Sequence, residues 1–329
     1  MKKRIAAIIM AAAMVMGLAA CQSTDGKADS SAQAEGNAKY RVGICQLVQH
    51  EALDAATEGF QDALKDELGD DVTFDVQNAQ NDSNTCSTIV NSFVANNVDL
   101  IMANGTASLQ AAAAGTADIP ILGTSITEYG VALGLDDFNG TVGGNISGTS
   151  DLAPLDEQAQ MIKDLFPDAK KVGILYCSAE ANSQYQVDTI TGYLEKLGYT
   201  CSNYAFSDSN DLSTVVTNAA SESDVIYVPT DNTVASNTGI IHNTCLAAGV
   251  PVVAGEENAC KGCGVATLSI SYYDLGYTTG QMAAKILTGE ADISQMSIEY
   301  APEFTKKYNP SICEEYNVKI PEGYEAIEE

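Results

Sequence analysis

The sequence predicts an α/β protein with two similar lobes, each a parallel sheet covered by helices. Short apolar runs typical of buried strands alternate along the chain with segments whose apolar residues recur at helical spacing. The order of these elements over residues 41–122 restarts at about residue 171. Alternating strands and helices indicate parallel sheets, and the repeated order indicates two lobes of the same topology.

In the first half, we expect strands at residues 41–45, 72–76, 98–103 and 119–122. The first two helices are marked by Leu53, Ala56, Phe60 and Leu64, and then by Ile89, Val90, Phe93 and Val94. In the second half, we expect strands at 171–176, 200–206, 224–229 and 250–253, and a short terminal helix at 310–316. A glycine-rich run at residues 143–148 predicts a strand crossing between the lobes, with the hinge near residues 148–155.

The N-terminus has the pattern of an exported lipoprotein. A basic start is followed by an apolar stretch at residues 5–16, which is too short to span a bilayer. Leu18-Ala19-Ala20-Cys21 resembles a bacterial lipobox, although an ordinary secretory signal with a chance cysteine is the alternative. We therefore expect a signal peptide at 1–20, lipidation of Cys21, a flexible tether up to residue 39, and a membrane-anchored domain outside the cytoplasm at the cell surface.

Composition excludes several functions. The formal charge of −28 argues against nucleic acid as a partner. The chain lacks GxSxG, P-loop, HExxH and GxGxxG motifs, so we expect no enzyme activity and no cofactor. Only Arg4 and Arg41 could supply a guanidinium, which argues against a ligand carrying several negative charges.

The cysteines form no evident metal site. Cys260 and Cys263 make a single CxxC, without the second pair or paired histidines that zinc requires. A local disulfide or two free thiols is the favoured interpretation, and a metal or redox site is the alternative. The other cysteines after Cys21 lie mostly in apolar surroundings typical of buried small residues.

Small polar and acidic residues follow the predicted strands, where ligands bind to parallel sheets. In the first half these are Gln46, His50, Thr106, Thr124, Ser125, Thr127 and Glu128. In the second half they are Asn182, Ser183, Thr230, Asp231, Asn232 and Glu256. We expect them to line a cleft between the lobes.

Some of these residues have a simpler interpretation. Thr106, Ser183 and Asn232 are also typical helix N-caps. Asp231 and Glu256 are less easily explained as caps, and their carboxylates suit a ligand ammonium group. With so few arginines, a zwitterion with one carboxylate and one ammonium fits better than a multiply charged anion.

Several motifs resemble one known family. They are residues 49–54 (QHEALD), 78–80 (NAQ), 148–151 (GTSD), 180–183 (EANS), 228–233 (VPTDNT) and 272–276 (YYDLG). Over residues 40–329 the chain resembles the ABC-transporter substrate-binding proteins of the tryptophan/tyrosine-binding lipoprotein group. The resemblance implies the type I periplasmic binding protein fold, with two Rossmann-like lobes joined by a three-crossover hinge. It places 40–147 plus 271–296 in one lobe and 148–270 plus 297–329 in the other.

The resemblance also implies a function. It predicts a monomer that binds an aromatic or hydrophobic amino acid (tyrosine, tryptophan or phenylalanine) and delivers it to an ABC permease, with no metal. Thr106, Ser125 and Thr127 would hold the carboxylate, and Asp231, helped by Glu256, would hold the ammonium. Asn182 and Ser183 would close from the second lobe, while Gln46 and His50 would shape the side-chain pocket. A departure at Thr127-Glu128-Tyr129, where the family commonly has Thr-Asp-Pro, leaves the ligand side chain open. An adhesin or sensory role and a receptor for a nucleoside-like ligand are the alternatives.

Overall fold

In the computed structural model, which describes residues 38–301 and 303–328, the strands form one sheet in each lobe. The first sheet has the order β11-β5-β4-β3-β1-β2, and the second has the order β13-β12-β10-β9-β8-β6-β7. Strand pairs are parallel except for β10 with β12. The predicted α/β class with two parallel-sheet lobes is therefore confirmed. The expected signal peptide, Cys21 and most of the tether lie outside the described residues.

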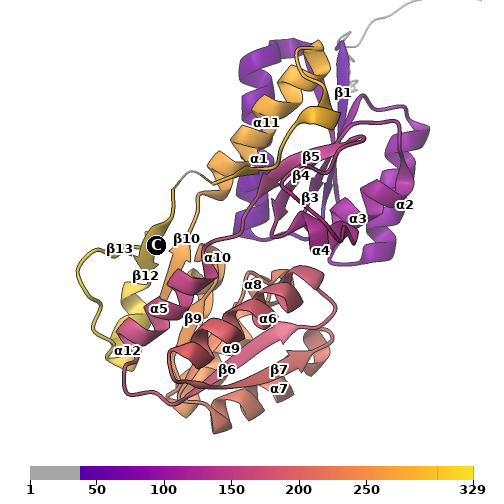
Figure 1. Ribbon diagram of the computed structural model, residues 1–329. Helices are drawn as coiled ribbons and strands as arrows, with labels where there is room; N and C mark the ends of the chain where they lie inside the picture. Colours follow the sequence, from indigo (N-terminus) through magenta and orange to yellow (C-terminus); the bar gives the residue numbers. More distant parts are fainter. Residues whose placement is uncertain (1–37, 302, 329) are drawn as a thin grey trace, which may run out of the picture. The chain divides into compact units, whose positions relative to one another are not determined.

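The first lobe carries helices on both faces of its sheet (Figure 1). Its strands are β1 (Tyr40–Gln46), β2 (Val72–Asn78), β3 (Leu100–Asn104), β4 (Ile121–Ile126), β5 (Ile146–Ser150) and β11 (Glu299–Tyr300). Its helices are α1 (Glu51–Leu68), α2 (Ser83–Ala95), α3 (Thr106–Gly115), α4 (Tyr129–Leu133) and α11 (Tyr272–Thr288), with short 3-10 turns at Gly69–Asp71 and Ile293–Gln295.

Alternation along β1 explains this layering. Ile44 packs in a core with Phe60 of α1 and Met282 of α11, whereas Cys45 packs on the other face with Phe93 of α2. Helices α1 and α11 lie side by side because Gly276 has no side chain, and a Cβ there would lie 1.9 Å from the carbonyl oxygen of Ala56.

The second lobe repeats the arrangement. Its strands are β6 (Lys171–Cys177), β7 (Thr200–Phe206), β8 (Val225–Val228), β9 (Val252–Ala254), β10 (Ala266–Ser269), β12 (Thr305–Tyr308) and β13 (Glu325–Ala326). Its helices are α5 (Leu155–Leu165), α6 (Ala181–Lys196), α7 (Ser209–Glu222), α8 (Asn232–Ala235), α9 (Thr238–Ala248), α10 (Glu257–Cys263) and α12 (Pro310–Tyr316). Apolar residues of α5, α6 and α12 cover one face of the sheet, and those of α7, α9 and α10 cover the other.

The chain passes between the lobes after β5, before α11, and between β11 and β12. The predicted boundary at 147/148 is wrong, because β5 pairs with β4 and keeps residues up to Ser150 in the first sheet. Gly143 and Gly144, at φ 80° and 61°, form a turn before β5 rather than a crossing strand. Likewise, residues 297–300 do not belong to the second lobe, since β11 pairs with β5.

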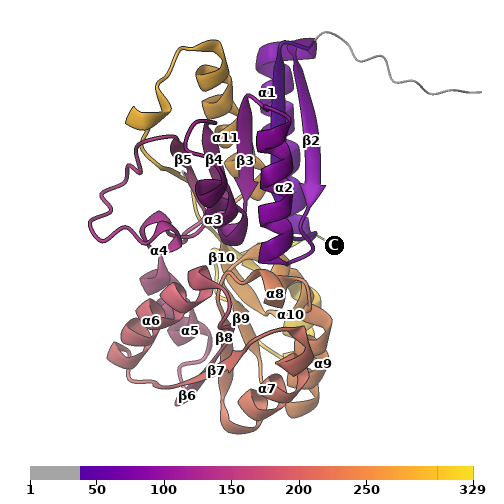
Figure 2. The same ribbon diagram turned by 90° about the vertical axis from the view of Figure 1, so that its right-hand side faces the viewer.

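The lobes also meet away from these crossings. Helix α4 of the first lobe contacts α6 of the second (Figure 2). Within the part of the chain that the structure describes, no helix is both long and apolar enough to cross a membrane.

Candidate ligand-binding site

The predicted polar residues meet around a small cavity between the lobes, at the carboxyl ends of strands from both sheets. Its volume is about 10 Å³, which matches the space that one water molecule needs. Binding sites for small molecules are typically several hundred Å³, so a larger ligand enters only if the lobes or their side chains move. The lining residues are His50, Leu53, Ser125, Thr127, Asp151, Asn182, Thr230, Asp231, Asn232, Ala235, Glu256 and Tyr272.

Asp231 lies on the second-lobe side of the cavity and is the N-cap of α8. Its Oδ1 accepts from the Val234 N–H at 2.8 Å, and its Oδ2 accepts from the Cys177 N–H at 2.7 Å and the Ser183 hydroxyl at 2.8 Å. Burial, and then the nearby Glu180 carboxylate, raise the pKa of Asp231 to about 8. Asp231 therefore joins the end of β6 to the starts of α6 and α8.

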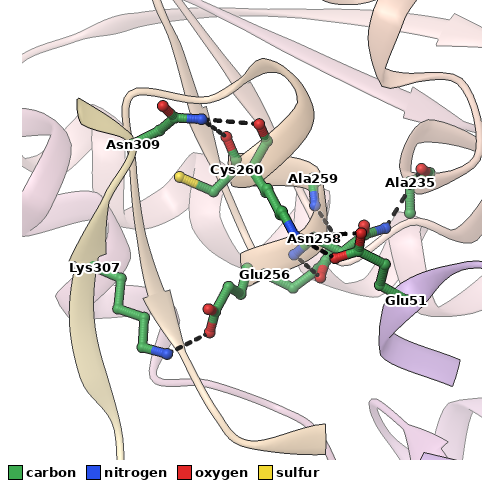
Figure 3. Close-up of polar contacts among 10 residues, drawn as sticks. Glu51, Ala235, Glu256, Asn258, Ala259, Cys260, Lys307 and Asn309 are labelled. Carbon is green, nitrogen blue, oxygen red and sulfur yellow. Dashed lines mark hydrogen bonds and ion pairs between the residues drawn. The ribbon is translucent and has the colours of Figure 1, made fainter. Parts of the chain in front are cut away.

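Glu256 has the same arrangement at α10. It is the N-cap, and its carboxylate accepts from the N–H groups of Asn258 and Ala259 (Figure 3). Burial raises the pKa of Glu256 to about 7, although the hydrogen bonds from Ala259 and Asn258 lower it. Asp231 and Glu256 are therefore both helix N-caps, although sequence reasoning found them less easily explained as caps alone. Both also line the cavity, so their cap bonds leave the expectation that they face a ligand untested.

The residues expected as caps have other roles. Gly105 and Glu180 occupy the N-cap positions of α3 and α6, which places Thr106 and Ser183 inside the helices. Asn232 begins α8 after its cap. Thr106 and Asn232 each lie one residue after the cap, within the residue or two by which sequence alone leaves a helix start uncertain. Ser183 lies three residues after Glu180, so its expected role as a cap is wrong by more than that.

Glu180 is a carboxylate that the predicted set did not include. Its two oxygens accept from Asn232 N–H and Nδ2 at 3.0 and 2.9 Å, and from Thr233 N–H and Oγ1 at 2.9 and 2.8 Å. This fixes the start of α8, from which Asn232 reaches the other lobe. There His50 Nε2 lies 3.2 Å from Asn232 Oδ1. A second bond between the lobes runs from Asn81 Nδ2 to Thr233 Oγ1 at 3.0 Å.

The first-lobe side of the cavity is less completely bonded. Ser125 lies at an irregularity in the pairing of β4 with β5 and has a left-handed φ of 55°, a conformation that is strained in a residue with a side chain. Its buried hydroxyl has no hydrogen-bond partner among the described residues. Strain and an unpaired polar group together are typical of a functional position.

Asp151 and Tyr272 also line this side, although neither was among the predicted site residues. The Tyr272 hydroxyl donates to Asp151 Oδ2 at 3.0 Å. Burial raises the pKa of Asp151 to about 6, although the hydroxyls of Thr127 and Tyr272 lower it. Asp151 could have been found from its position in the sequence, since it directly follows a strand, where ligands bind to parallel sheets.

The other predicted residues lie outside the cavity. Gln46 is buried in the first lobe, where it bonds to Thr57 and Asp54. Thr124 bonds to the buried hydroxyls of Thr149 and Thr279, since β4 runs further than predicted. Glu128 is the N-cap of α4 and accepts from the Val131 N–H.

Thr106 lines a second, wider opening. This groove of about 390 Å³ is shared by α2, α3 and the starts of α6, α7 and α8, and Asn182 borders both it and the cavity. Most of its lining is polar, including Gln80, Asn81 and Glu180. It continues the interlobe cleft outward from the cavity.

Cys260 and Cys263 are free thiols in the structure, which corrects the disulfide alternative. Both are buried on the core side of α10, and their Sγ atoms donate to the carbonyl oxygens of Gly264 and Ala259 at 3.5 and 3.2 Å. Residues 38–301 and 303–328 contain no group of His, Cys, Asp and Glu side chains placed to hold a metal ion.

Residues 41–326 match the family described as ABC transporter substrate binding protein. A tyrosine-binding protein of Clostridioides difficile is 37% identical over 295 residues, covering 88% of this chain and 85% of that protein.

Solved structures agree. An ABC domain from Streptococcus pneumonia in complex with L-Trp has a TM-score of 0.83 and 32% identity, covering 88% of this chain and all of that one. A ligand-free, open structure of a substrate-binding protein with adhesive properties from Clostridium difficile has a TM-score of 0.68 and 36% identity, covering 88% and 99%. The type I periplasmic binding protein fold is thus confirmed, and the prediction that the protein is not an enzyme is confirmed by its relatives. Their role implies a small-molecule ligand and a location outside the cytoplasm, and the chain belongs to the family of ABC transporter substrate-binding proteins.

Proposed function

We propose that this protein is the lipid-anchored receptor of an ABC importer and binds an aromatic amino acid between its lobes. The observation that carries this proposal is the composition of the interlobe cavity. Three carboxylates, those of Asp151, Asp231 and Glu256, line it together with hydroxyls, and no lysine or arginine does. Such a lining favours a ligand with an ammonium group, and it leaves hydroxyls and backbone N–H groups for a single carboxylate.

The relatives support the aromatic side chain. One is called tyrosine-binding and another was solved with L-Trp. The cavity offers Leu53 and Ala235 as apolar surface beside the rings of His50 and Tyr272, a combination that can pack against an aromatic ring. The lipid anchor rests on the lipobox at Leu18–Cys21.

Thermal unfolding of the full chain tests this proposal directly. The protein is unfolded and refolded to remove carried ligand, and then heated with each of the twenty amino acids and a panel of nucleosides. A ligand at 100 times its Kd stabilises by about 2.7 kcal/mol, a shift of a few degrees for a protein of this size. We expect the shift with tyrosine, tryptophan or phenylalanine and none with alanine, which has the same charged groups without a ring. A shift in the unfolding temperature with nucleosides alone would replace the amino acid ligand by a nucleoside.

A second role is favoured by one observation, the relative described as having adhesive properties. A deletion strain that takes up the ligand normally but attaches poorly to host cells would support adhesion. A strain that loses uptake and attaches normally would leave transport as the single role.

A further inference from the structure

The two buried aspartates of the cavity differ in how their oxygens are used. Asp231 has donors on both oxygens, from Cys177, Ser183 and Val234. Asp151 is equally buried, with 4% of its surface exposed. Its Oδ2 accepts from Tyr272, but its Oδ1 has no hydrogen-bond partner among the described residues. Buried carboxylate oxygens are normally paired, so this atom is open to a donor from a bound molecule.

The groups around Asp151 do not provide the missing positive charge. The cavity has no lysine or arginine in its lining. His50 is the one basic side chain there, and burial lowers its pKa, which keeps the ring neutral at pH 7. Glu256 and the hydroxyls of Thr127, Tyr129 and Tyr272 are the other ionisable or polar groups whose charges or bonds act on Asp151. The lining therefore supplies no positively charged donor to Asp151, and a ligand is the source that can bring one.

Its position connects Asp151 to the hinge. It is the first residue after β5, where the chain leaves the first lobe, and Tyr272 begins α11, where the chain returns. The Tyr272–Asp151 bond therefore joins two of the crossings. Ser125 and its unpaired hydroxyl line the same cavity from the first lobe.

We propose that Asp151 Oδ1, rather than Asp231, receives the ammonium group of the ligand. This inference rests on the proposed function for the presence of that group, and it revises the role given to Asp231 from sequence. Asp231 is a positioning residue that holds helix starts, while Asp151 binds the charge at the hinge.

Calorimetric titration of the full chain separates these roles. The probes are L-tyrosine and L-tryptophan, their analogues without the amino group, 3-(4-hydroxyphenyl)propanoate and indole-3-propanoate, and the amines tyramine and tryptamine. A buried hydrogen bond to a charged group is worth about 10- to 100-fold in affinity. We expect the wild type to prefer the amino acid over its deaminated analogue by about 100-fold, and Asp151→Asn to reduce this preference to below about 10-fold.

Two further variants keep the test decisive. Asp231→Asn should keep most of the preference for the amino group, even where its thermal stability falls. Asp151→Glu retains the charge and should keep the preference at lower affinity, which separates a charge effect from a folding defect. The inference is overturned if Asp151→Asn keeps the wild-type preference, or if Asp231→Asn alone removes it.

Failure of the proposed function has a different signature. If the amines bind in an Asp151-dependent manner and no amino acid does, the ammonium site stands and the amino acid assignment falls. If aromatic amino acids bind equally well to wild type and Asp151→Asn, the amino acid assignment stands and the ammonium site at Asp151 is rejected. If no probe binds to the wild type, both are rejected.

Discussion

The two sides of the interlobe cavity are built from similar residues in opposite ways. On the second-lobe side, the carboxylates of Asp231 and Glu256 are used by the backbone N–H groups of helix starts. On the first-lobe side, Ser125 Oγ and Asp151 Oδ1 are buried and unpaired among the described residues. Burial alone therefore does not identify a binding group. A carboxylate whose two oxygens both accept hydrogen bonds stabilises the helix starts. A carboxylate with an unpaired oxygen remains available to a ligand.

The largest expected effect is the loss of stability when a carboxylate on the second-lobe side of the cavity is removed. Asp231→Ala leaves the buried donors of Cys177, Ser183 and Val234 without their acceptor. We expect the free energy of unfolding to fall by about 3–5 kcal/mol, because three buried donors are left without a hydrogen-bond partner. Urea unfolding followed by circular dichroism measures the loss.

Asp208→Ala is the matched control. Asp208 is also an N-cap, accepting from Asn210 N–H at 2.8 Å, but it is exposed. Removing an exposed cap costs about 1 kcal/mol. If the two alanine variants lose the same stability, the second-lobe carboxylate is an ordinary cap and the contrast between the two sides fails.

The next effect is the dependence of stability on pH. In the ligand-free protein, burial raises the pKa of Asp151 to about 6, that of Glu256 to about 7 and that of Asp231 to about 8. The unfolded chain releases these protons near pH 4, so the native state binds more protons between about pH 4 and 8. The contribution of these groups to stability is therefore fully present below pH 4 and is lost as the pH rises through the native values.

Asp151→Asn should remove the Asp151 part of this loss. We expect wild type and variant to have similar unfolding free energies near pH 4, and the variant to be more stable by on the order of 2 kcal/mol at pH 7. Urea unfolding at several pH values and constant salt gives both curves. Parallel curves would mean that Asp151 carries no unpaired charge.

Much of the fold could be predicted because it depends on local patterns. The strand at 171–176 and the helix at 310–316 follow from apolar runs and from Pro310, and the structure has β6 and α12 there. The end of the fourth strand was wrong, because β4 continues through an irregular pairing that places Ser125 at a positive φ. Such a backbone detail has no signature in a serine.

The sequence predicted where the site lies better than it predicted the role of each side chain. Strand ends gave eight of the cavity-lining residues, since topology brings them to one edge. The role of Asp151 depends on Tyr272, which is 121 positions away in the chain. Which oxygen stays unpaired is decided by such long-range packing, which periodicity and motifs do not report.

A smaller effect isolates the strain at Ser125. Ser125→Gly and Ser125→Ala both remove the unpaired hydroxyl, but only glycine adopts the φ of 55° without a Cβ penalty. We expect the glycine variant to be more stable than the alanine variant by about 1 kcal/mol. Thermal unfolding of the two variants side by side measures this difference. Equal stability would show that the backbone at Ser125 stores no strain, and the first-lobe side would then differ only in hydrogen bonding.

The smallest effect is expected where the lobes meet at the surface. Lys261 Nζ of α10 lies 3.1 Å from Glu51 Oε2 of α1, and the side chains are 39% and 65% exposed. Exposed pairs of this kind contribute about 0.2–1 kcal/mol and are screened by salt. A double-mutant cycle of Glu51→Gln and Lys261→Met should therefore give a coupling energy below about 0.5 kcal/mol that vanishes in 1 M salt. The pair of Lys307 with Glu257 at 2.7 Å, which lies within the second lobe and is less exposed, is the comparison and should couple more strongly. A strong, salt-resistant coupling between Glu51 and Lys261 would instead mean that surface charge, rather than the buried groups at the hinge, sets how firmly the two lobes are held together.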